Sequence, residues 1–464
     1  MSTTTQEVSA SVPRAGASQI HASSVSLRWN FSWTFVGNVI YAACQWGILV
    51  MLAKVGNPQM VGQFGLALAI AMPVFALSSL QLRAVLTTDV HERIPFGEYL
   101  GFRLATTLLS LLIIAGSPLF MHYRWDSTLV ILGVGLAQAL EAVSDIYYAL
   151  MQFHEHMDRI AKSMSVRGIL GLAAMAAGVY FTGKVAWGVV GLILGRVVVL
   201  LAYDINERTH LASGSESGSQ RIKKALSTAK HLLRPRWNRS TQNELFRTSI
   251  TLGVVAMLVS LLPNIPRYFI VGSLGEHALG LFTATAFLVS SGNLIVNALG
   301  QSAFVRLAKH CATGNKSAFT SLLARLMGIG AVLGLGGVGV AALFGRELLT
   351  LLYRPEYAEH VDVLVTMMVA GALTYANGLL GPAVTSARLF KPQIPVLALA
   401  VAAAAISSLL LIPTRGLLGA ALAVVVTGVV VCTGQALLLL FVLRKMDATA
   451  AQTPASHQAS VAGA

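Results

Sequence analysis

Apolar residues along the chain form runs of about 20 residues, the length that crosses a bilayer as a helix, and short polar stretches separate them. Leu, Ala, Val and Gly fill these runs without the strict alternation that barrel strands show. A helix satisfies its own backbone hydrogen bonds inside the hydrocarbon core. The pattern therefore predicts an all-α, polytopic membrane protein with about 12 transmembrane helices.

The predicted helices fall into two sets of six on either side of one long polar stretch. They lie near 31–53, 60–82, 99–120, 128–150, 165–183, 185–203, 248–272, 278–300, 322–345, 360–386, 393–413 and 416–443. This spacing predicts a disordered cytoplasmic tail at 1–27, a six-helix lobe at 28–203, a basic linker at 204–247, a second six-helix lobe at 248–444 and a disordered cytoplasmic tail at 445–464.

The first part of the linker, at 213–219, is rich in Ser and Gly. Apolar residues follow at helical spacings of 4, 3 and 4, with Arg and Lys between them: Ile222, Leu226, Ala229 and Leu233. This pattern predicts a basic amphipathic helix on the cytoplasmic leaflet. A solvated connector is the alternative.

Composition agrees with a membrane protein. Of the 464 residues, 55% are hydrophobic and 11% are charged, against about 25% charged in soluble domains. Of the 33 Lys and Arg residues, 25 fall in segments predicted to be cytoplasmic, six in outside segments and two, Arg196 and Arg267, within helices. This bias follows the positive-inside rule with both chain ends in the cytoplasm. The net charge of +14 is thus expected to set topology and meet anionic lipid, and nucleic acid is not an expected partner.

The two halves share short motifs at matching positions. Gly56…Gly62-x-Phe64 corresponds to Gly275…Gly280-x-Phe282, and Lys184-x-x-x-Gly188 corresponds to Arg415-x-x-x-Gly419. Six helices per half give both copies the same orientation in the membrane. The repeats therefore predict two pseudo-symmetric lobes, with a substrate site where the halves meet.

Four motifs flank the predicted helices. They are Leu52-Ala53-Lys54-Val55-Gly56…Val61-Gly62-Gln63-Phe64, Phe344-Gly345-Arg346-Glu347-Leu348-Leu349…Leu352-Tyr353…Tyr357-Ala358, Ala387-Arg388, and Arg415-Gly416-x-x-Gly419-Ala420-Ala421. Together they resemble the polysaccharide exporters and Wzx-type lipid-linked oligosaccharide flippases of the MOP superfamily, to which the MATE transporters are related. The resemblance covers about residues 28–443.

The resemblance implies a V-shaped transporter with a central cavity between two lobes. It implies a cargo of undecaprenyl-pyrophosphate-linked oligosaccharide, moved by alternating access across a bacterial inner membrane for the biosynthesis of O-antigen, capsule or exopolysaccharide. The lipid bilayer is one expected partner. A polysaccharide polymerase and glycosyltransferases are the protein partners that such a pathway implies.

Arg267 is the first candidate for binding the cargo phosphate. It follows Pro263, Asn264 and Pro266 within a predicted helix, where prolines interrupt the backbone hydrogen bonds and free carbonyl groups. An arginine inside the membrane usually faces a cavity, and its planar fork suits phosphate. The alternative is that Arg267 reaches the outer interface. Asn264 is a second candidate, near Gln45 when the repeats are superposed.

Other polar residues form smaller groups. Asn38, Tyr41 and Gln45 make one helical stripe, which could bind sugar hydroxyls or join helices. Glu141 and Asp145 lie one turn apart and could carry H⁺ or Na⁺; pairing with Arg196 is the alternative. No other cofactor and no metal is expected. Arg83 and Arg306 end two predicted helices at the cytoplasmic face, where they would attract incoming pyrophosphate or only signal topology.

Two other functions stay open at this point. A MATE-like drug or cation antiporter would favour carboxylates over an arginine in the cavity. An integral-membrane polymerase or glycosyltransferase would need catalytic groups on a large outside loop, whereas the longest predicted outside loop is short, near 345–360. The sequence shows no Gly-rich phosphate loop, zinc signature or nucleophile elbow, so we expect a transporter and not an enzyme.

Overall fold

The computed structural model describes residues 27–89, 94–121, 123–205, 234–386 and 392–452. Three expectations lie outside this part of the chain: the tail at 1–26, the amphipathic helix at 222–233, and the end of the second tail at 453–464. Throughout the described residues the regular structure is helical. The all-α prediction is confirmed.

The first half of the chain forms one lobe. Its helices are α1 (Leu27–Val55), α2 (Pro58–Ser79), α3 (Leu82–Thr88), α4 (Phe96–Met121), α5 (Trp125–Phe153), α6 (Met157–Thr182) and α7 (Val185–Val199), which continues as the π-helical turn η1 (Leu200–Asp204). Helix α5 packs against α2, α4 and α7, and α6 packs against α1 and α7. We call this group the N-lobe.

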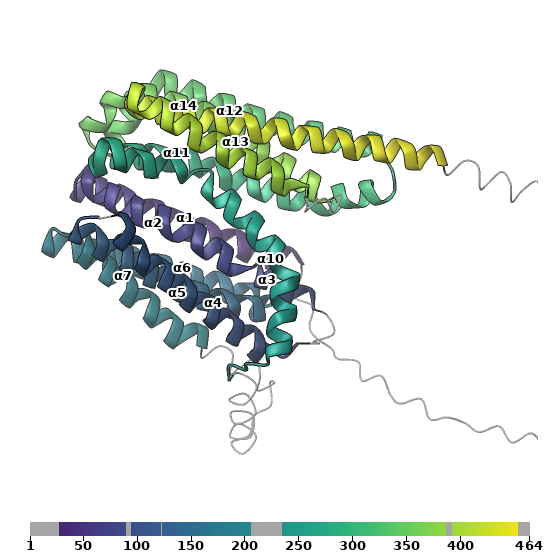
Figure 1. Ribbon diagram of the computed structural model, residues 1–464, viewed down its shortest axis with the longest axis horizontal. Helices are drawn as coiled ribbons and strands as arrows, with labels where there is room; N and C mark the ends of the chain where they lie inside the picture. The colour runs from purple at the N-terminus through teal and green to yellow at the C-terminus, as the bar shows by residue number, and fades with distance from the viewer. Residues whose placement is uncertain (1–26, 90–93, 122, 206–233, 387–391, 453–464) are drawn as a thin grey trace, which may run out of the picture.

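The second half consists of α10 (Arg239–Leu261), α11 (Ile265–Ala312), α12 (Lys316–Leu352), the 3-10 turn η2 (Pro355–His360), α13 (Val361–Ser386) and α14 (Gln393–Gln452). Helix α13 packs against α11, α12 and α14, and this group is the C-lobe. Helix α10 differs, because it packs against α2 and α4 of the N-lobe as well as α14. Figure 1 shows the two lobes one above the other, with α10 running between them.

Ten helical stretches of the described residues are long and apolar enough to cross a membrane. Two of them, at 74 and 52 residues, exceed the roughly 20 residues that one crossing needs. Each contains one glycine with non-helical backbone, Gly275 (φ 84°) and Gly416 (φ 58°). A left-handed φ suits glycine because it has no Cβ. Each of these glycines therefore marks a point where a long helical stretch could divide into two crossings, and the count of 12 remains a prediction.

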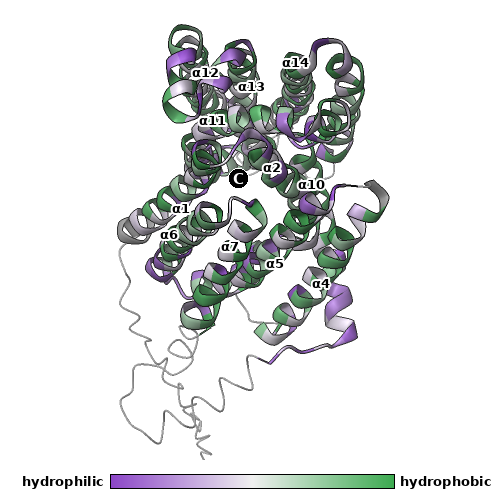
Figure 2. Ribbon diagram, turned by 90° about the vertical axis from the view of Figure 1, so that its left-hand side faces the viewer, coloured by the Kyte–Doolittle hydropathy of each residue, from purple (hydrophilic) through white to green (hydrophobic). Residues whose placement is uncertain are grey.

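The helices present apolar side chains on their outer faces. Leu112, Leu119, Val332 and Leu343 are all well exposed, and Figure 2 shows hydrophobic residues along most of each helix. Exposed apolar surface on this scale is unfavourable in water and is expected where lipid is the solvent. The chain is a multi-pass membrane protein.

The start of α10 is anchored to the N-lobe. The buried Glu98 of α4 accepts hydrogen bonds from the Asn238 backbone N–H (3.1 Å) and the Gln242 amide (3.1 Å). The Arg236 N–H bonds to the Gly97 carbonyl at 2.9 Å. Residues 239–247, which the sequence places in the linker, are therefore helical and docked.

Two positive charges assigned to cytoplasmic segments lie inside the N-lobe instead. Arg103 is buried within α4 and Arg167 within α6. Each has a carboxylate partner, Asp145 at 3.8 Å and Asp204 at 2.7 Å respectively. The sequence assigns these arginines to the cytoplasmic side, but hydropathy alone does not reveal that a carboxylate faces each of them.

Candidate functional site

The lobes meet at one end of the bundle, where α2 crosses α11. A Cβ added to Gly62 would collide with the Glu276 carbonyl, and a Cβ added to Gly280 would collide with the Pro58 carbonyl. Phe64 and Phe282, each two residues after the glycine of its motif, are also buried. We call this end the closed end. The opposite end, where α1 begins and α14 finishes, is the terminal end; the lobes diverge toward it in Figure 1.

Glu276 joins the lobes at the closed end. Its carboxylate accepts hydrogen bonds from the side chains of Gln59 (3.3 Å) and Gln63 (3.1 Å) on α2, and from the Ser127 hydroxyl on α5. Charge-assisted hydrogen bonds of this kind are stronger than neutral ones. One C-lobe carboxylate thus holds three N-lobe groups.

Two further bonds cross between the lobes. The Tyr268 hydroxyl donates to the Ala69 carbonyl on α2 at 2.5 Å. The Arg354 guanidinium donates to the Lys54 carbonyl at 2.9 Å. Since Lys54 and Arg354 fall in turns that the sequence assigns to the outside, these bonds close the side that the predicted topology makes periplasmic.

Arg267 lies beside this contact, in the first turn of α11. The preceding turn, 262–264, interrupts the helix between α10 and α11, and Pro266 occupies the start of α11, where a missing N–H costs nothing. The Arg267 side chain is only 9% exposed, and its Nε has no hydrogen-bond partner. It forms no ion pair with any carboxylate in the part of the chain that the structure describes.

Asn264 has a local role in this turn. Its side chain is buried and donates to the Ser260 carbonyl at 2.7 Å. That carbonyl is one that the interrupted helix leaves without its usual partner. The side-chain oxygen of Asn264 accepts no hydrogen bond from the described residues. A role of Asn264 in substrate binding therefore remains a prediction.

The stripe on α1 divides into two parts. Gln45 donates to the Tyr41 hydroxyl at 3.0 Å, and Tyr41 donates to Glu141 at 2.6 Å. Tyr41 therefore joins α1 to α5, the second of the two roles considered, and Gln45 supports it from within α1. Asn38 is exposed and donates to the Thr34 carbonyl of its own helix.

Glu141 extends this network to α7. It pairs with the buried Arg196 at 2.9 Å, and Arg196 also donates to Gln138 at 2.8 Å. The structure thus contains the ion pair that was the alternative to ion coupling. Whether Glu141 also carries a coupling ion remains a prediction.

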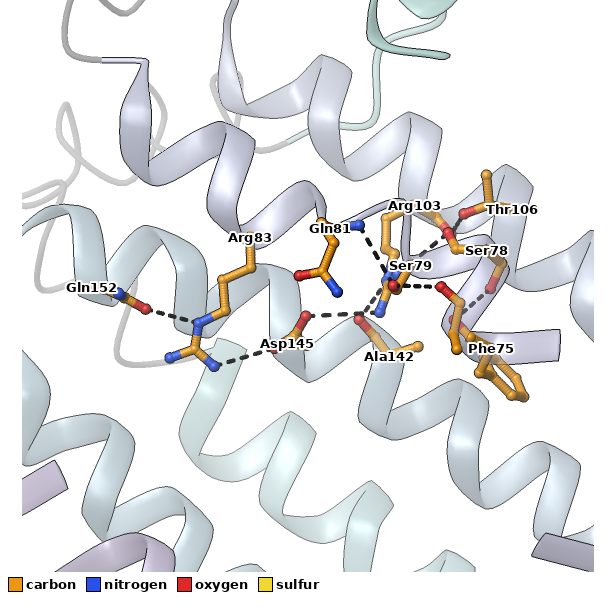
Figure 3. A network of polar contacts seen from close by, with 11 residues as sticks. Phe75, Ser78, Ser79, Gln81, Arg83, Arg103, Thr106, Ala142, Asp145 and Gln152 are labelled. Carbon is orange, nitrogen blue, oxygen red and sulfur yellow. Dashed lines mark hydrogen bonds and ion pairs between the residues drawn. The ribbon is translucent and has the colours of Figure 1, made fainter. Parts of the chain in front are cut away.

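Asp145 is held by two arginines, as Figure 3 shows. Arg83 lies 3.2 Å from one carboxylate oxygen and donates to Gln152 at 2.8 Å. Arg103 approaches the other oxygen at 3.8 Å and donates to the Ala142 carbonyl at 2.8 Å. Arg83 therefore binds within the N-lobe, whereas Arg306 on α11 is exposed and has no ion-pair partner among the described residues.

The sequence did not single out Glu276 or Asp204 as candidate site residues. Asp204 pairs with Arg167 and accepts from the Ser163 hydroxyl at 2.5 Å. Each of these acids ends or begins an apolar segment, which made both resemble ordinary loop residues. The repeat offered a signal for Glu276, because it follows Gly275 at the position that corresponds to Pro58, where the lobes meet.

Comparison with known proteins gives two kinds of likeness. The sequence is 27% identical over 400 residues to the capsular polysaccharide biosynthesis protein CapF of Staphylococcus aureus, covering 86% of this chain and 95% of that protein. No family model matches the chain.

The solved structures that resemble it are transporters. An inward-facing multidrug resistance MATE transporter of the MOP superfamily superposes with a TM-score of 0.68 at 13% identity, covering 90% of this chain and 99% of that one. A MOP transporter from Pyrococcus furiosus, described as having a binding pocket of reverse polarity, gives 0.59 at 12% identity, covering 90% and 94%. The chain is thus a multi-pass membrane protein with the transporter fold of the MOP superfamily, related in sequence to a capsular polysaccharide biosynthesis protein.

Proposed function

We propose that this protein moves a lipid-linked oligosaccharide, joined to its lipid through a pyrophosphate, across the bacterial inner membrane for the synthesis of a surface polysaccharide. The transport is by alternating access between the two lobes. The apolar tail stays in lipid, while the phosphates and sugars pass through the space between the lobes. The relationship to CapF supports a role in polysaccharide synthesis, and the fold supports transport.

The observation that carries the proposal is the unpaired Arg267. Each of the buried arginines of the N-lobe, Arg103, Arg167 and Arg196, has a carboxylate within 4.0 Å. An arginine at the centre of a membrane costs about 2.5–3.5 kcal/mol on insertion scales, and Arg267 has no described carboxylate to offset that cost. A phosphate of the cargo would supply the missing anion through two parallel hydrogen bonds.

The carboxylates argue against a cationic drug as cargo. Glu141 and Asp145 are already bound by arginines, and Glu276 accepts three hydrogen bonds. An organic cation would have to displace the groups that are bound to these carboxylates. An anionic cargo would instead meet Arg267, which has no carboxylate partner among the described residues. The same pairing makes H⁺ or Na⁺ coupling through Glu141 and Asp145 a weaker proposal than a structural role.

The state of the molecule fits the first step of such a cycle. Apart from the packing of α10 on the N-lobe, the contacts between the lobes lie at the closed end, which the predicted topology places outside. The terminal end is then cytoplasmic, with both chain ends on that side, and a cargo made in the cytoplasm would enter there. Arg306 lies on the same side and is free to attract it.

The experiment is complementation of a strain from which this gene is deleted. Arg267→Ala should abolish surface polysaccharide while leaving the protein level normal, with lipid-linked repeat units accumulating on the cytoplasmic face. Arg267→Lys keeps the charge but loses the fork, so we expect partial recovery. Normal surface polysaccharide in the deletion strain, together with loss of organic-cation export, would select the antiporter instead.

A further inference from the structure

A surface of the C-lobe has the chemistry of a sugar site. A groove of about 360 Å³ lies between α11 and α13 of the C-lobe. Its polar lining is neutral, with side chains of Asn297 and Gln301 from α11 and Thr385 from α13, and the ring of Phe304 borders it. Pockets for small ligands begin near roughly 300 Å³, so the groove can take one or two sugar rings at most.

The helical spacing along α11 indicates that the groove faces the N-lobe rather than lipid. Gly280, Thr283, Phe287, Ser290, Asn297 and Gln301 follow one another at spacings of 3, 4 and 7, so they share one face of the helix. At the closed end this face touches α2, where a Cβ on Gly65 would collide with the Thr283 side chain. Asn297 and Gln301 lie further along the same face, where the lobes have separated, and both are exposed.

The two amides need polar partners that the protein does not provide. No hydrogen bond from Asn297 or Gln301 occurs to any residue that the structure describes. An unsatisfied amide in an apolar setting costs several kcal/mol, which excludes a lipid-facing position and indicates a wet one. Thr385 accepts a bond from Gln393 at 3.2 Å, so its hydroxyl proton is still available to donate.

Glycines bring the two helices together at this point. A Cβ on Gly300 would lie 3.1 Å from the Gly378 carbonyl oxygen and 3.4 Å from Pro382. The close crossing leaves a shallow floor, with the amides on one side and Thr385 on the other. Phe304, 37% exposed, offers an apolar ring face at the rim. Amides that bind hydroxyls beside an aromatic face are a combination suited to a pyranose ring, which has both polar edges and apolar faces.

We propose that this groove is a saccharide subsite, through which the C-lobe binds a sugar of the cargo as it enters. The assignment rests on the proposed function and adds that two separate sites bind two different parts of the cargo. The charged Arg267 takes the phosphates, and the neutral groove takes hydroxyl or N-acetyl groups. Asn297 follows Gly280 by 17 residues, which places the groove about 25 Å along α11 from the closed end, toward the terminal end.

The test is binding to the purified full-length protein by two probes. One is the phosphate-free oligosaccharide released by mild acid from the cells' own lipid-linked precursors, and the other is inorganic pyrophosphate. Asn297→Leu/Gln301→Leu should bind the oligosaccharide at least tenfold more weakly, a loss of about 1.4 kcal/mol, and bind pyrophosphate as the wild type does. Arg267→Ala should show the reverse pattern.

Two variants guard against misfolding and non-specific effects. Thr385→Val removes a hydroxyl from the other helix with little change in volume and should also weaken oligosaccharide binding. Asn243→Leu makes the same amide-to-leucine change at an exposed position of α10 and should leave binding unchanged.

The outcomes separate the two proposals. Wild-type oligosaccharide affinity in the double variant and in Thr385→Val, with both proteins folded, overturns the groove and leaves the proposed function standing. If the wild-type protein restores surface polysaccharide but does not bind the oligosaccharide, the groove is likewise overturned and the proposed function stands. A deletion strain with normal surface polysaccharide removes the proposed function, and the saccharide subsite with it.

Discussion

Gly62 and Gly280 lie against each other's helices at the closed end, although 218 residues separate them in sequence. The contact is reciprocal: Gly62 meets Glu276 and Gly280 meets Pro58, and Pro58 and Glu276 are also 218 residues apart. Such reciprocity is expected only where a twofold axis passes between equivalent residues. The pseudo-symmetry axis of the molecule therefore runs through this crossing of α2 and α11.

The first prediction concerns this crossing. Gly62→Ala and Gly280→Ala each place a methyl group against a backbone carbonyl, which cannot move aside as a side chain can. We expect each change to destabilise the protein by about 1–3 kcal/mol and to lower its thermal unfolding temperature in detergent. Gly272→Ala is the matched control, because nothing lies within 4 Å of its added methyl. Equal unfolding temperatures for all three variants would contradict the close crossing.

The second prediction concerns the three bonds to Glu276. Glu276→Gln removes the charge that Gln59, Gln63 and Ser127 share, so the closed end should separate more often. Spin labels at Asp126 and Glu347, both exposed, would report longer distances in a cysteine-free background. His277→Gln breaks an exposed 2.8 Å contact with Glu356 inside the C-lobe alone and should not change the distances. An unchanged distance distribution in Glu276→Gln would show that these bonds do not hold the closed end.

A third prediction addresses the pair of Glu141 and Arg196. Removing one partner of a fully buried ion pair costs roughly 3–5 kcal/mol; we expect less here, because Glu141 is 31% exposed. Glu141→Gln and Arg196→Gln should each lower stability, and the double variant should lose less than the sum of the two. Thermal unfolding of the four proteins measures this coupling. Full stability in Glu141→Gln, with transport that no longer responds to a proton or sodium gradient, would instead support ion coupling.

The fourth prediction concerns the anchor of α10. Glu98→Ala removes the acceptor for the Asn238 N–H and the Gln242 amide, and hydrogen bonds to charged groups contribute about 1.5–3 kcal/mol each. Hydrogen exchange at 236–242 should become faster in this variant. Glu244→Ala, at an exposed position of the same helix, should not change it. Equal exchange in both variants would mean that other contacts hold α10.

Much of the fold was predictable because hydropathy alone determines which segments cross a membrane. The repeat singled out Gly62 and Gly280 as equivalent positions, and the structure places both in the contact between the lobes. What the sequence missed were pairings between distant helices. Arg103 and Arg167 illustrate this: each has its carboxylate on another helix, a relation that no spacing within one segment reveals.

The site was less predictable than the fold. Arg267 was identifiable because a charge beside two prolines in an apolar run is conspicuous. Whether the other polar residues were free or paired depended on tertiary contacts: Tyr41 and Gln45 turned out to bond within the N-lobe. Asn297 and Gln301 were not among the candidates, because their position beside α13 depends on a contact between helices that the sequence does not reveal.

Transbilayer movement in liposomes tests the central claim most directly. The full-length protein is reconstituted with the lipid-linked oligosaccharide, and the fraction that becomes accessible to an added glycosidase is followed with time. The account predicts rapid movement with the wild type, a rate at least tenfold lower with Arg267→Ala, and an intermediate rate with Arg267→Lys. Wild-type rates in a folded Arg267→Ala protein, or no movement with the wild type, would contradict it.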